Sequence, residues 1–229
     1  HASKLIEKFT GQHFDRQHLT LPAYRQIKEY LNTNFFFISP KEDYRLDTIL
    51  EKARFLVRRR GIKCLVIDPY NRLEDESDGH NETKYISKQL DRLTNFAQRN
   101  DVMVILMAHP TKQSKNKDGV IEAPTLYDIS GSAHFYNKTD FGIVVHRNRI
   151  DNTVEVHVQK VKFRHLGECG TALFKYNLNN GRYSPYTAGV EPVWDNSNHL
   201  QEEMNRRAKE AEEAAVFDFT AQPLDECPF

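Results

Sequence analysis

The stretch Cys64-Leu65-Val66-Ile67-Asp68 decides the fold. An apolar run followed directly by an acid predicts a buried strand that delivers a carboxylate at its C-terminal end. In open sheets of parallel strands, ligands bind outside the carboxyl ends of the strands. An acid there can hold the water shell of a Mg2+ ion bound to nucleotide phosphates, which is the Walker B pattern. A strand followed by a turn-forming Asp68-Pro69 pair is the alternative explanation.

Helical and strand patterns alternate around this stretch. Helices are expected at residues 2–9, 22–31, 46–57 and 86–97, and Gly61 is expected to stop the third of them. Buried strands are expected at 35–39, 64–67 and 102–107. Strands that alternate with helices predict an α/β fold with a parallel sheet covered by helices on both faces. Strands are also expected at 141–145, 154–158 and 171–176, where alternation favours a more antiparallel section.

The composition changes after about residue 186. Residues 187–200 have the character of a linker, and residues 202–215 carry charge on nearly every face. The second segment is either an exposed helix or a partly disordered tail. We therefore expect a core at residues 1–186 and a linker, charged helix and acidic tail at residues 187–229.

Composition limits the classes of function. The 32 Lys and Arg residues balance the 32 Asp and Glu residues, so nucleic acid would have to be bound by local patches or by several copies around a strand. Three cysteines without metal or disulfide spacing fit a reducing cytosol. We find no apolar run long enough to span a bilayer and no signal peptide. The Arg58-Arg59-Arg60 cluster is best explained as a helix C-terminus, where cations favour the dipole.

Two further segments carry chemistry-bearing side chains. His109 directly follows the strand at 102–107, so it is expected to face the same crevice as Asp68 and to sense a γ-phosphate; an ordinary loop histidine is the alternative. The basic run from Lys160 to Gly170 is either a solvated hairpin or the support of an arginine finger, which neutralises charge on a transferred phosphoryl group.

These motifs together resemble the helicase domain of phage primase-helicases, of mitochondrial Twinkle and, more distantly, of DnaB-type bacterial helicases. The resemblance covers residues 1–186 and rests on Asp68, His109, the turn at 128–132, Arg147-Asn148 and Lys162-x-Arg164-x-x-Gly167. It implies a RecA-like P-loop NTPase core in a ring-forming, hexameric replicative DNA helicase that hydrolyses ATP with Mg2+ and translocates on single-stranded DNA. A RecA-type recombinase or other ATPase of this fold, and a non-catalytic interaction module, are the alternatives.

The resemblance implies a role for each matching residue at the phosphates. Asp68 would organise the Mg2+ ion, and His109 would relay the γ-phosphate signal to the DNA-binding loops. Arg164 would be the arginine finger that reaches a neighbour's ATP, with Lys162 beside it. Asn137 stands where relatives often carry glutamine, which suggests phosphate sensing.

The resemblance also implies contacts to the base and to DNA. Arg147 and Tyr176 would sandwich the nucleotide base. Residues 111–124 match a central-channel loop, and its Lys112, Lys115 and Lys117 suit phosphate contacts. Residues 71–82 match a second channel loop, but their acidic character predicts a weak grip on DNA.

Both ends of the chain carry expectations of their own. The sequence contains no GxxxxGK[ST] loop, and the resemblance places that loop just upstream of His1. We therefore expect a chain that begins after the Walker A strand and loop and does not hydrolyse ATP or unwind DNA alone. The acidic tail ending in Pro228-Phe229 resembles that of bacterial single-stranded-DNA-binding proteins and suggests docking to replication proteins; a disordered end without a role is the alternative.

Overall fold

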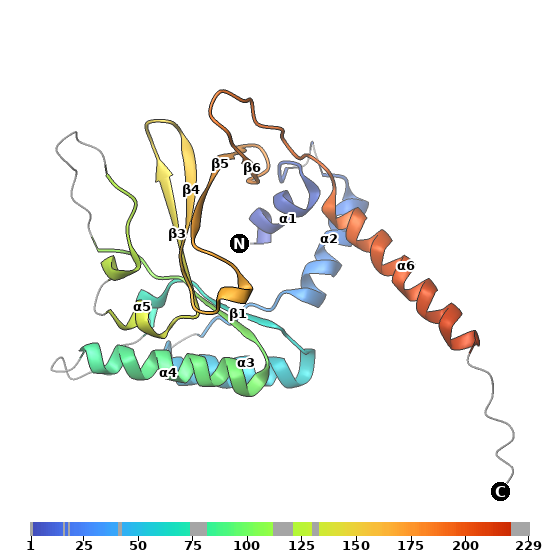
Figure 1. The fold of residues 1–229 in the computed structure, drawn as a ribbon. Helices are drawn as coiled ribbons and strands as arrows, with labels where there is room; N and C mark the ends of the chain where they lie inside the picture. Colours follow the sequence, from blue (N-terminus) through green and yellow to red (C-terminus); the bar gives the residue numbers. More distant parts are fainter. Residues whose placement is uncertain are drawn as a thin grey trace, which may run out of the picture. The chain divides into compact units, whose positions relative to one another are not determined.

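The fold is that of a computed structural model, which describes residues 2–15, 17, 19–40, 43–73, 82–111, 121–129 and 133–220 (Figure 1). The chain divides into two compact units. The helical unit comprises residues 1–31, 176–184 and 192–229, and the sheet unit comprises residues 32–175 and 185–191. Among the described residues, no helix combines the length and apolar character needed to cross a membrane.

The sheet unit starts with two helices and two parallel strands. In chain order these are α3 (Leu46–Arg60), β1 (Cys64–Ile67), α4 (Glu82–Asn100) and β2 (Met103–Leu106). β1 pairs with β2 in parallel, from Cys64 opposite Met103 to Ile67 opposite Leu106. The predicted parallel pairing of these two strands is therefore confirmed.

Helix α3 ends where the sequence predicts. Gly61 adopts the left-handed conformation with φ 65°, and its backbone N–H donates to the carbonyl of Val57 at 2.9 Å. Glycine takes this conformation without the steric cost that a Cβ atom brings. The three arginines at 58–60 occupy the last turn, where the partial negative charge of the helix end favours cations.

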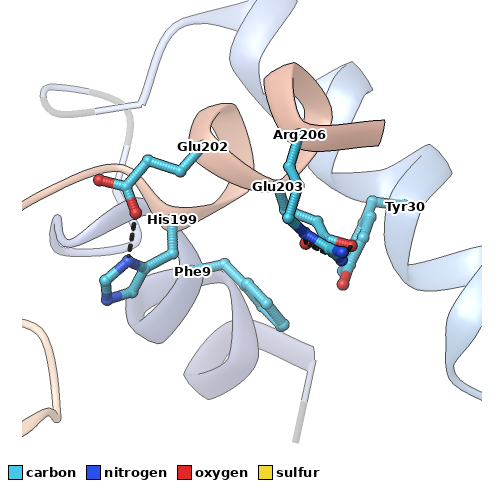
Figure 2. A pocket seen from close by; sticks show the side chains of 6 residues that line it. All are labelled: Phe9, Tyr30, His199, Glu202, Glu203 and Arg206. Atoms are coloured by element: carbon cyan, nitrogen blue, oxygen red, sulfur yellow. Dashed lines mark hydrogen bonds and ion pairs between the residues drawn. The ribbon is translucent and has the colours of Figure 1, made fainter. Parts of the chain in front are cut away.

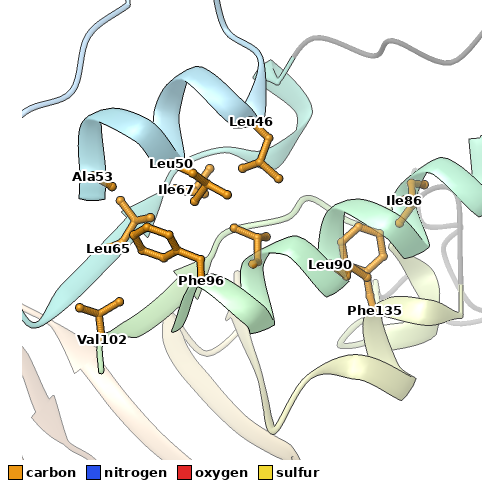
Figure 3. Packing of buried hydrophobic residues seen from close by; sticks show 11 residues of the cluster. Leu46, Leu50, Ala53, Leu65, Ile67, Ile86, Leu90, Phe96, Val102 and Phe135 are labelled. Atoms are coloured by element: carbon orange, nitrogen blue, oxygen red, sulfur yellow. The ribbon is translucent and has the colours of Figure 1, made fainter. Parts of the chain in front are cut away.

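The core of the sheet unit lies between α3, α4 and one face of the β1–β2 pair (Figure 3). Its buried members are Leu46, Leu50, Ala53, Leu65, Ile67, Ile86, Leu90, Leu93, Phe96, Val102 and Phe135. Each large apolar side chain buried in this way contributes about 1.5–3 kcal/mol. This burial fixes the position of β1 and β2 relative to α3 and α4.

The prediction that helices cover both faces of this sheet is only partly met. Leu65 and Ile67 are buried, whereas Val66 is 55% exposed and Met103 is 64% exposed. Since side chains alternate across a strand, this pattern means that the described helices cover one face of the pair.

The second half of the sheet unit is antiparallel, as the sequence predicts. Three strands are joined in the order β3 (Phe141–Asn148), β4 (Thr153–Val161) and β5 (Gly170–Tyr176), and the short strand β6 (Tyr183–Pro185) follows along the chain. β3 pairs with β4 and β4 with β5, both antiparallel, with a register shift at Gly142/Ile143. The remaining short helical elements are η1 (Tyr70–Arg72), η2 (Leu126–Asp128), α5 (His134–Lys138) and η3 (Arg164–Leu166).

The strand predicted at residues 35–39 is wrong. Residues 35–40 have no regular secondary structure, and Phe37 is 63% exposed. The aromatic ring of Phe36 instead lies 5.8 Å from the Arg60 guanidinium, within reach of a cation–π contact. An apolar run becomes a strand only beside a partner edge, and here the ring of Phe36 lies against a helix end instead.

The helical unit contains α1 (Ala2–Thr10), α2 (Leu21–Asn34) and α6 (His199–Thr220). The first two helices lie close to the expected positions. The third shows that the charged segment at 202–215 forms a helix rather than an irregular tail. Its charges pair along the helix, as in the Arg206 ion pairs with Glu203 and Glu210.

Arg182 connects α1 with the segment before α6 in the helical unit. Its guanidinium donates to the carbonyls of Lys8 at 2.8 Å and Phe9 at 3.3 Å, at the C-terminal end of α1. It also donates to the carbonyls of Asp195 at 3.0 Å and Ser197 at 2.7 Å, just before α6. One planar cation thus satisfies four carbonyls from two distant segments.

Asn180 repeats this arrangement with a fully buried side-chain amide. It donates to the carbonyls of Gly11 at 3.2 Å and Asp195 at 3.3 Å, and to the side chain of Asn196 at 3.0 Å. Gly11 has φ 73°, and a Cβ atom there would lie 2.5 Å from the carbonyl oxygen of Asn196 and 2.7 Å from that of Ser197. The segment before α6 therefore approaches α1 at a distance that only glycine permits.

Replacing Gly11 tests this close approach. Gly11→Ala is expected to lower the free energy of unfolding by at least about 2 kcal/mol more than Gly61→Ala, because the alanine meets backbone atoms that cannot give way. Gly61 is the matched control: it has φ 65° and open space within 4 Å of the place that a Cβ atom would take, so alanine there carries only the cost of the left-handed backbone, about 1–2 kcal/mol. Guanidinium denaturation followed by circular dichroism measures both, and equal losses would contradict the close approach.

Candidate functional site

Asp68 stands at the end of β1, and the backbone around it is fixed to β2. The N–H of Met107 donates to the carbonyl of Ile67 at 2.9 Å, and the N–H of Tyr70 donates to the carbonyl of Met107 at 2.7 Å. These bonds continue the parallel ladder past the last paired residues. The Asp68 carboxylate itself is exposed, and it makes no hydrogen bond or ion pair with the part of the chain that the structure describes.

His109 leaves the same edge of the sheet. It follows β2 just after Met107, whose backbone is bonded on both sides to the β1 end. Because β1 and β2 run parallel, Asp68 and His109 both project from the carboxyl edge of the pair. The imidazole is exposed and, among the described residues, has no hydrogen-bond partner. The structure thus brings together the two residues that the sequence predicts at one ligand-binding edge.

A closed loop base follows His109. The N–H of Thr111 donates to the carbonyl of Asp128 at 2.7 Å, and Pro110 forms a β-bridge with Ile129. The Asp128 carboxylate accepts from the N–H of Thr125 at 2.6 Å and from its hydroxyl at 2.9 Å. These bonds, from the backbone first and the hydroxyl second, lower the pKa of Asp128 below its ordinary value.

The three lysines predicted to contact DNA lie outside the described residues. Lys112, Lys115 and Lys117 belong to the segment 112–120, and the turn at 128–132 is described only through Ile129. The acidic residues at 74–81 also fall outside. What the structure supplies is the frame from which the lysine segment departs at Thr111 and to which it returns before Thr125.

Lys162 and Arg164 differ in how they are held. The Lys162 ammonium pairs with Asp140 Oδ1 at 2.7 Å, and its backbone N–H donates to the Asp140 carbonyl at 2.9 Å. Arg164 begins η3, is exposed, and makes no ion pair or hydrogen bond within the described ranges. The paired lysine anchors the strand end, and the arginine is left extended toward solvent.

Arg147 lies near the end of β3, opposite Val154 of β4, which in turn pairs with Phe174 of β5. Its side chain is exposed, with one long hydrogen bond of 3.4 Å to Asn152. Asn137 lies in α5 with an exposed side chain, and its carbonyl accepts from the Lys160 ammonium at 3.2 Å.

Tyr176 belongs to an aromatic cluster that sequence reasoning missed. Its ring lies 5.1 Å from that of Tyr183, and the Lys8 ammonium lies 5.9 and 5.8 Å from the two ring centroids. Lys8 also donates to the carbonyl of Gly181, and burial lowers the pKa of its ammonium. The tight turn between Asn177 and Arg182 brings the two tyrosines together. A local sequence pattern does not predict a partner as distant in sequence as Lys8.

A second aromatic cluster was also missed. The rings of Tyr127 and Tyr136 are stacked, with centroids 4.6 Å apart and planes 24° apart. The Lys160 ammonium lies 4.9 Å from the Tyr136 centroid and donates to the Tyr136 carbonyl. The only sequence signal was that Lys160 opens the basic run.

The helical unit contains a pocket of about 360 Å³ between α1, α2 and α6 (Figure 2). Its lining residues are Phe9, Tyr30, His199, Glu202, Glu203 and Arg206. None of them was predicted as a site residue. The charged groups are paired with one another: His199 Nδ1 lies 2.9 Å from Glu202, and Arg206 bonds Glu203. The pocket is best explained by the packing of α6 on the other two helices.

Comparison with known proteins adds family evidence. Residues 7–184 match the family model described as the DnaB-like helicase C terminal domain. The chain is 40% identical over 207 residues to the Twinkle homolog protein, chloroplastic/mitochondrial, of Arabidopsis thaliana. This match covers 83% of the chain and 29% of that protein. It is 27% identical over 152 residues to the DNA helicase/primase of Enterobacteria phage T3. This match covers 62% of the chain and 26% of that protein. The chain thus spans less than a third of the length of these relatives.

The Asp128 bonds to Thr125 give a prediction for the loop base. A carboxyl whose pKa is lowered on folding stabilises the folded state above its unfolded value near 3.8, and this contribution is lost as the pH falls through the lowered pKa. Thr125→Val removes the hydroxyl bond and keeps the backbone bond, so the Asp128 pKa is expected to rise part of the way toward 3.8 in a carbon-13 NMR titration. Thr139→Val, whose hydroxyl bonds the Phe141 carbonyl, is the control. An unchanged Asp128 titration in Thr125→Val would refute the capping bond.

Proposed function

Because this chain belongs to the DnaB-like helicase C-terminal domain family, we propose that it forms the nucleotide-hydrolysing and DNA-gripping part of a ring-forming, ATP-dependent replicative DNA helicase. The observation that carries this proposal is the shared carboxyl edge of β1 and β2, from which Asp68 and His109 both project without partners among the described residues. An exposed acid and an exposed imidazole at this edge fit a site for a phosphate-bound cation and its terminal phosphate.

Mg2+ and ATP are the cofactors that this edge fits. A carboxylate oxygen is the hard ligand that Mg2+ prefers, and the Asp68 carboxylate has no competing cation among the described residues. When bound, the ion neutralises charge that develops on the transferred phosphoryl group. In this arrangement Asp68 would hold the ion through its water shell, and His109 would donate a hydrogen bond toward the γ-phosphate. Asn137 is the further candidate for phosphate sensing.

Arg164 is proposed to act on the ATP of a neighbouring protomer. Its guanidinium extends from η3 without an intramolecular partner in the described chain, while Lys162 beside it is anchored to Asp140. An arginine that is already charged and unpaired can meet a phosphoryl group without first breaking an ion pair. Such a shared site requires a head-to-tail contact between protomers, which either closes into a ring or extends as a filament, and the hexameric ring of the family resemblance is the proposed assembly.

Base and DNA contacts complete the proposal. Arg147 and Tyr176 are proposed to hold the nucleotide base, since a guanidinium plane and an aromatic ring both stack on bases. Lys112, Lys115 and Lys117 are proposed to contact the phosphates of single-stranded DNA from the loop that closes at Thr111 and Asp128. The Pro228-Phe229 tail is proposed as a docking peptide for replication proteins, and it lies outside the described residues.

A subunit-mixing experiment tests the shared site. In the full-length protein, Asp68→Asn and Arg164→Ala are each expected to lower ATP hydrolysis by about a thousandfold or more, the usual effect of removing an arginine finger. An equal mixture of the two variants is expected to recover activity, because about a quarter of the interfaces in a random ring pair an intact Asp68 with an intact Arg164. Arg58→Ala, at the exposed end of α3, is the control and keeps full activity. A mixture as inactive as its components would show that the two residues do not share a site across protomers.

A second experiment concerns the chain alone. None of the 229 residues forms a GxxxxGK[ST] loop, whose backbone amides and lysine make most contacts to the phosphates. We therefore expect the isolated chain to bind ATP no more tightly with Mg2+ than without it and to hydrolyse none. Isothermal titration calorimetry and phosphate release measure this. Tight Mg2+-dependent binding would mean that another segment of the chain cradles the phosphates.

A further inference from the structure

Tyr127 presents an aromatic ring to solvent in a fixed position. Its side chain is 58% exposed, although its ring stacks on Tyr136 with a centroid distance of 4.6 Å. An aromatic side chain this exposed gains little of the stabilisation that burial of its apolar surface would provide. A ring that is both stacked on one side and open to solvent has the geometry of a platform for another flat ring.

The backbone under Tyr127 is clamped. Thr125 and Asp128 form a reciprocal capping box across η2. The Leu126 N–H donates to Gln159 Oε1 at 3.0 Å, and Gln159 Nε2 donates back to the Pro124 carbonyl at 2.8 Å. Leu126 is itself buried, so the short helix is fixed to β4 on one side of the tyrosine and capped on the other. A preorganised aromatic ring loses little conformational entropy when a ligand stacks on it.

Positive charge lies beside the stacked pair. The Lys160 ammonium is 4.9 Å from the Tyr136 centroid and donates to the carbonyls of Tyr136 and Asn137. These contacts hold the cation next to the rings. Aromatic rings interleaved with lysines are the arrangement that binds single strands, with bases on the rings and phosphates on the cations.

The platform stands at the base of the lysine-bearing loop. The carbonyl of Asp128, which directly follows Tyr127, accepts from both the N–H and the hydroxyl of Thr111, at 2.7 and 3.1 Å. Lys112, Lys115 and Lys117 come immediately after Thr111 in the sequence. An unpaired base can therefore stack where the proposed phosphate contacts begin, whereas the bases of a duplex are not open to stacking.

We propose that Tyr127 is a base-stacking residue for single-stranded nucleic acid, supported by Tyr136 and accompanied by the Lys160 cation. The proposal rests on the proposed function, because it assumes that the loop at 112–120 contacts the same strand. Stacking on a tyrosine tolerates any base, as a translocating motor requires.

Binding of a fluorescein-labelled oligo(dT) to the full-length protein with a non-hydrolysable ATP analogue tests this. Tyr127→Ala is expected to weaken binding about fivefold to a hundredfold, the range for losing one base–aromatic stack, while the slope of affinity against salt stays unchanged. Tyr127→Phe keeps the ring and is expected to bind as the unsubstituted protein does. Phe55→Ala removes an aromatic side chain that is 60% exposed on α3 and serves as the control.

Two further arms separate this proposal from the proposed function. An abasic oligonucleotide should bind the unsubstituted protein and Tyr127→Ala alike, and 5-iododeoxyuridine in the strand should cross-link to Tyr127. A variant with Lys112, Lys115 and Lys117 all changed to alanine should lose up to about two units of the salt slope on a single strand. If that variant loses binding while Tyr127→Ala binds normally, the stacking proposal is overturned and the helicase proposal stands. If the unsubstituted protein fails to bind the strand, both are overturned.

Discussion

The parallel pairing of β1 with β2 is the constraint on which the rest of the site depends. Two short strands supply few ladder bonds, and the pairing holds because Leu65 and Ile67 are buried against α3 and α4. The ladder then continues past the strands through Met107, whose N–H and carbonyl both bond to the β1 end. Asp68 and His109 consequently start from backbone positions that cannot shift independently, and two side chains from separate segments can address one ligand.

The two groups of proposed site residues carry opposite charges and lie on different sheets. At the antiparallel sheet, Lys162 is fixed by Asp140, and Arg164 two residues later is exposed. At the β1–β2 edge, the acid and the imidazole are exposed with no cation among the described residues beside them. Asp68 and Arg164 do not pair with each other within one chain, so each is available for a partner of opposite charge. That arrangement suits a site completed between copies better than one completed within a single chain.

Local patterns predict the elements that rely on local chemistry. The apolar spacing of α3, its stop at Gly61 and the apolar runs of β1 and β2 are found where the sequence places them. The run at 35–39 fails because a strand is defined by its neighbour, and the aromatic side chain of Phe36 lies by Arg60 instead. The roles assigned to the site residues remain predictions, although the shared edge of Asp68 and His109 follows from the order of strands. Arg182, Asn180 and the Lys8 contact with Tyr176 and Tyr183 were missed because the partners lie far away in sequence. The stacking of Tyr127 on Tyr136 was missed because it depends on how the turn between them folds.

A physical path joins the carboxyl edge of β1 and β2, the proposed nucleotide site, to the proposed aromatic platform. His109 lies two residues before Thr111, Thr111 is bonded to Asp128, and Asp128 is covalently joined to Tyr127. The path is short and each link is a peptide or hydrogen bond. If His109 contacts a γ-phosphate as proposed, its displacement would have to be absorbed at this loop base or passed on through it. The capping bonds of Thr125 stiffen the far side of that base. Coupling of this kind requires two discrete arrangements of the loop base, one favoured by each nucleotide state.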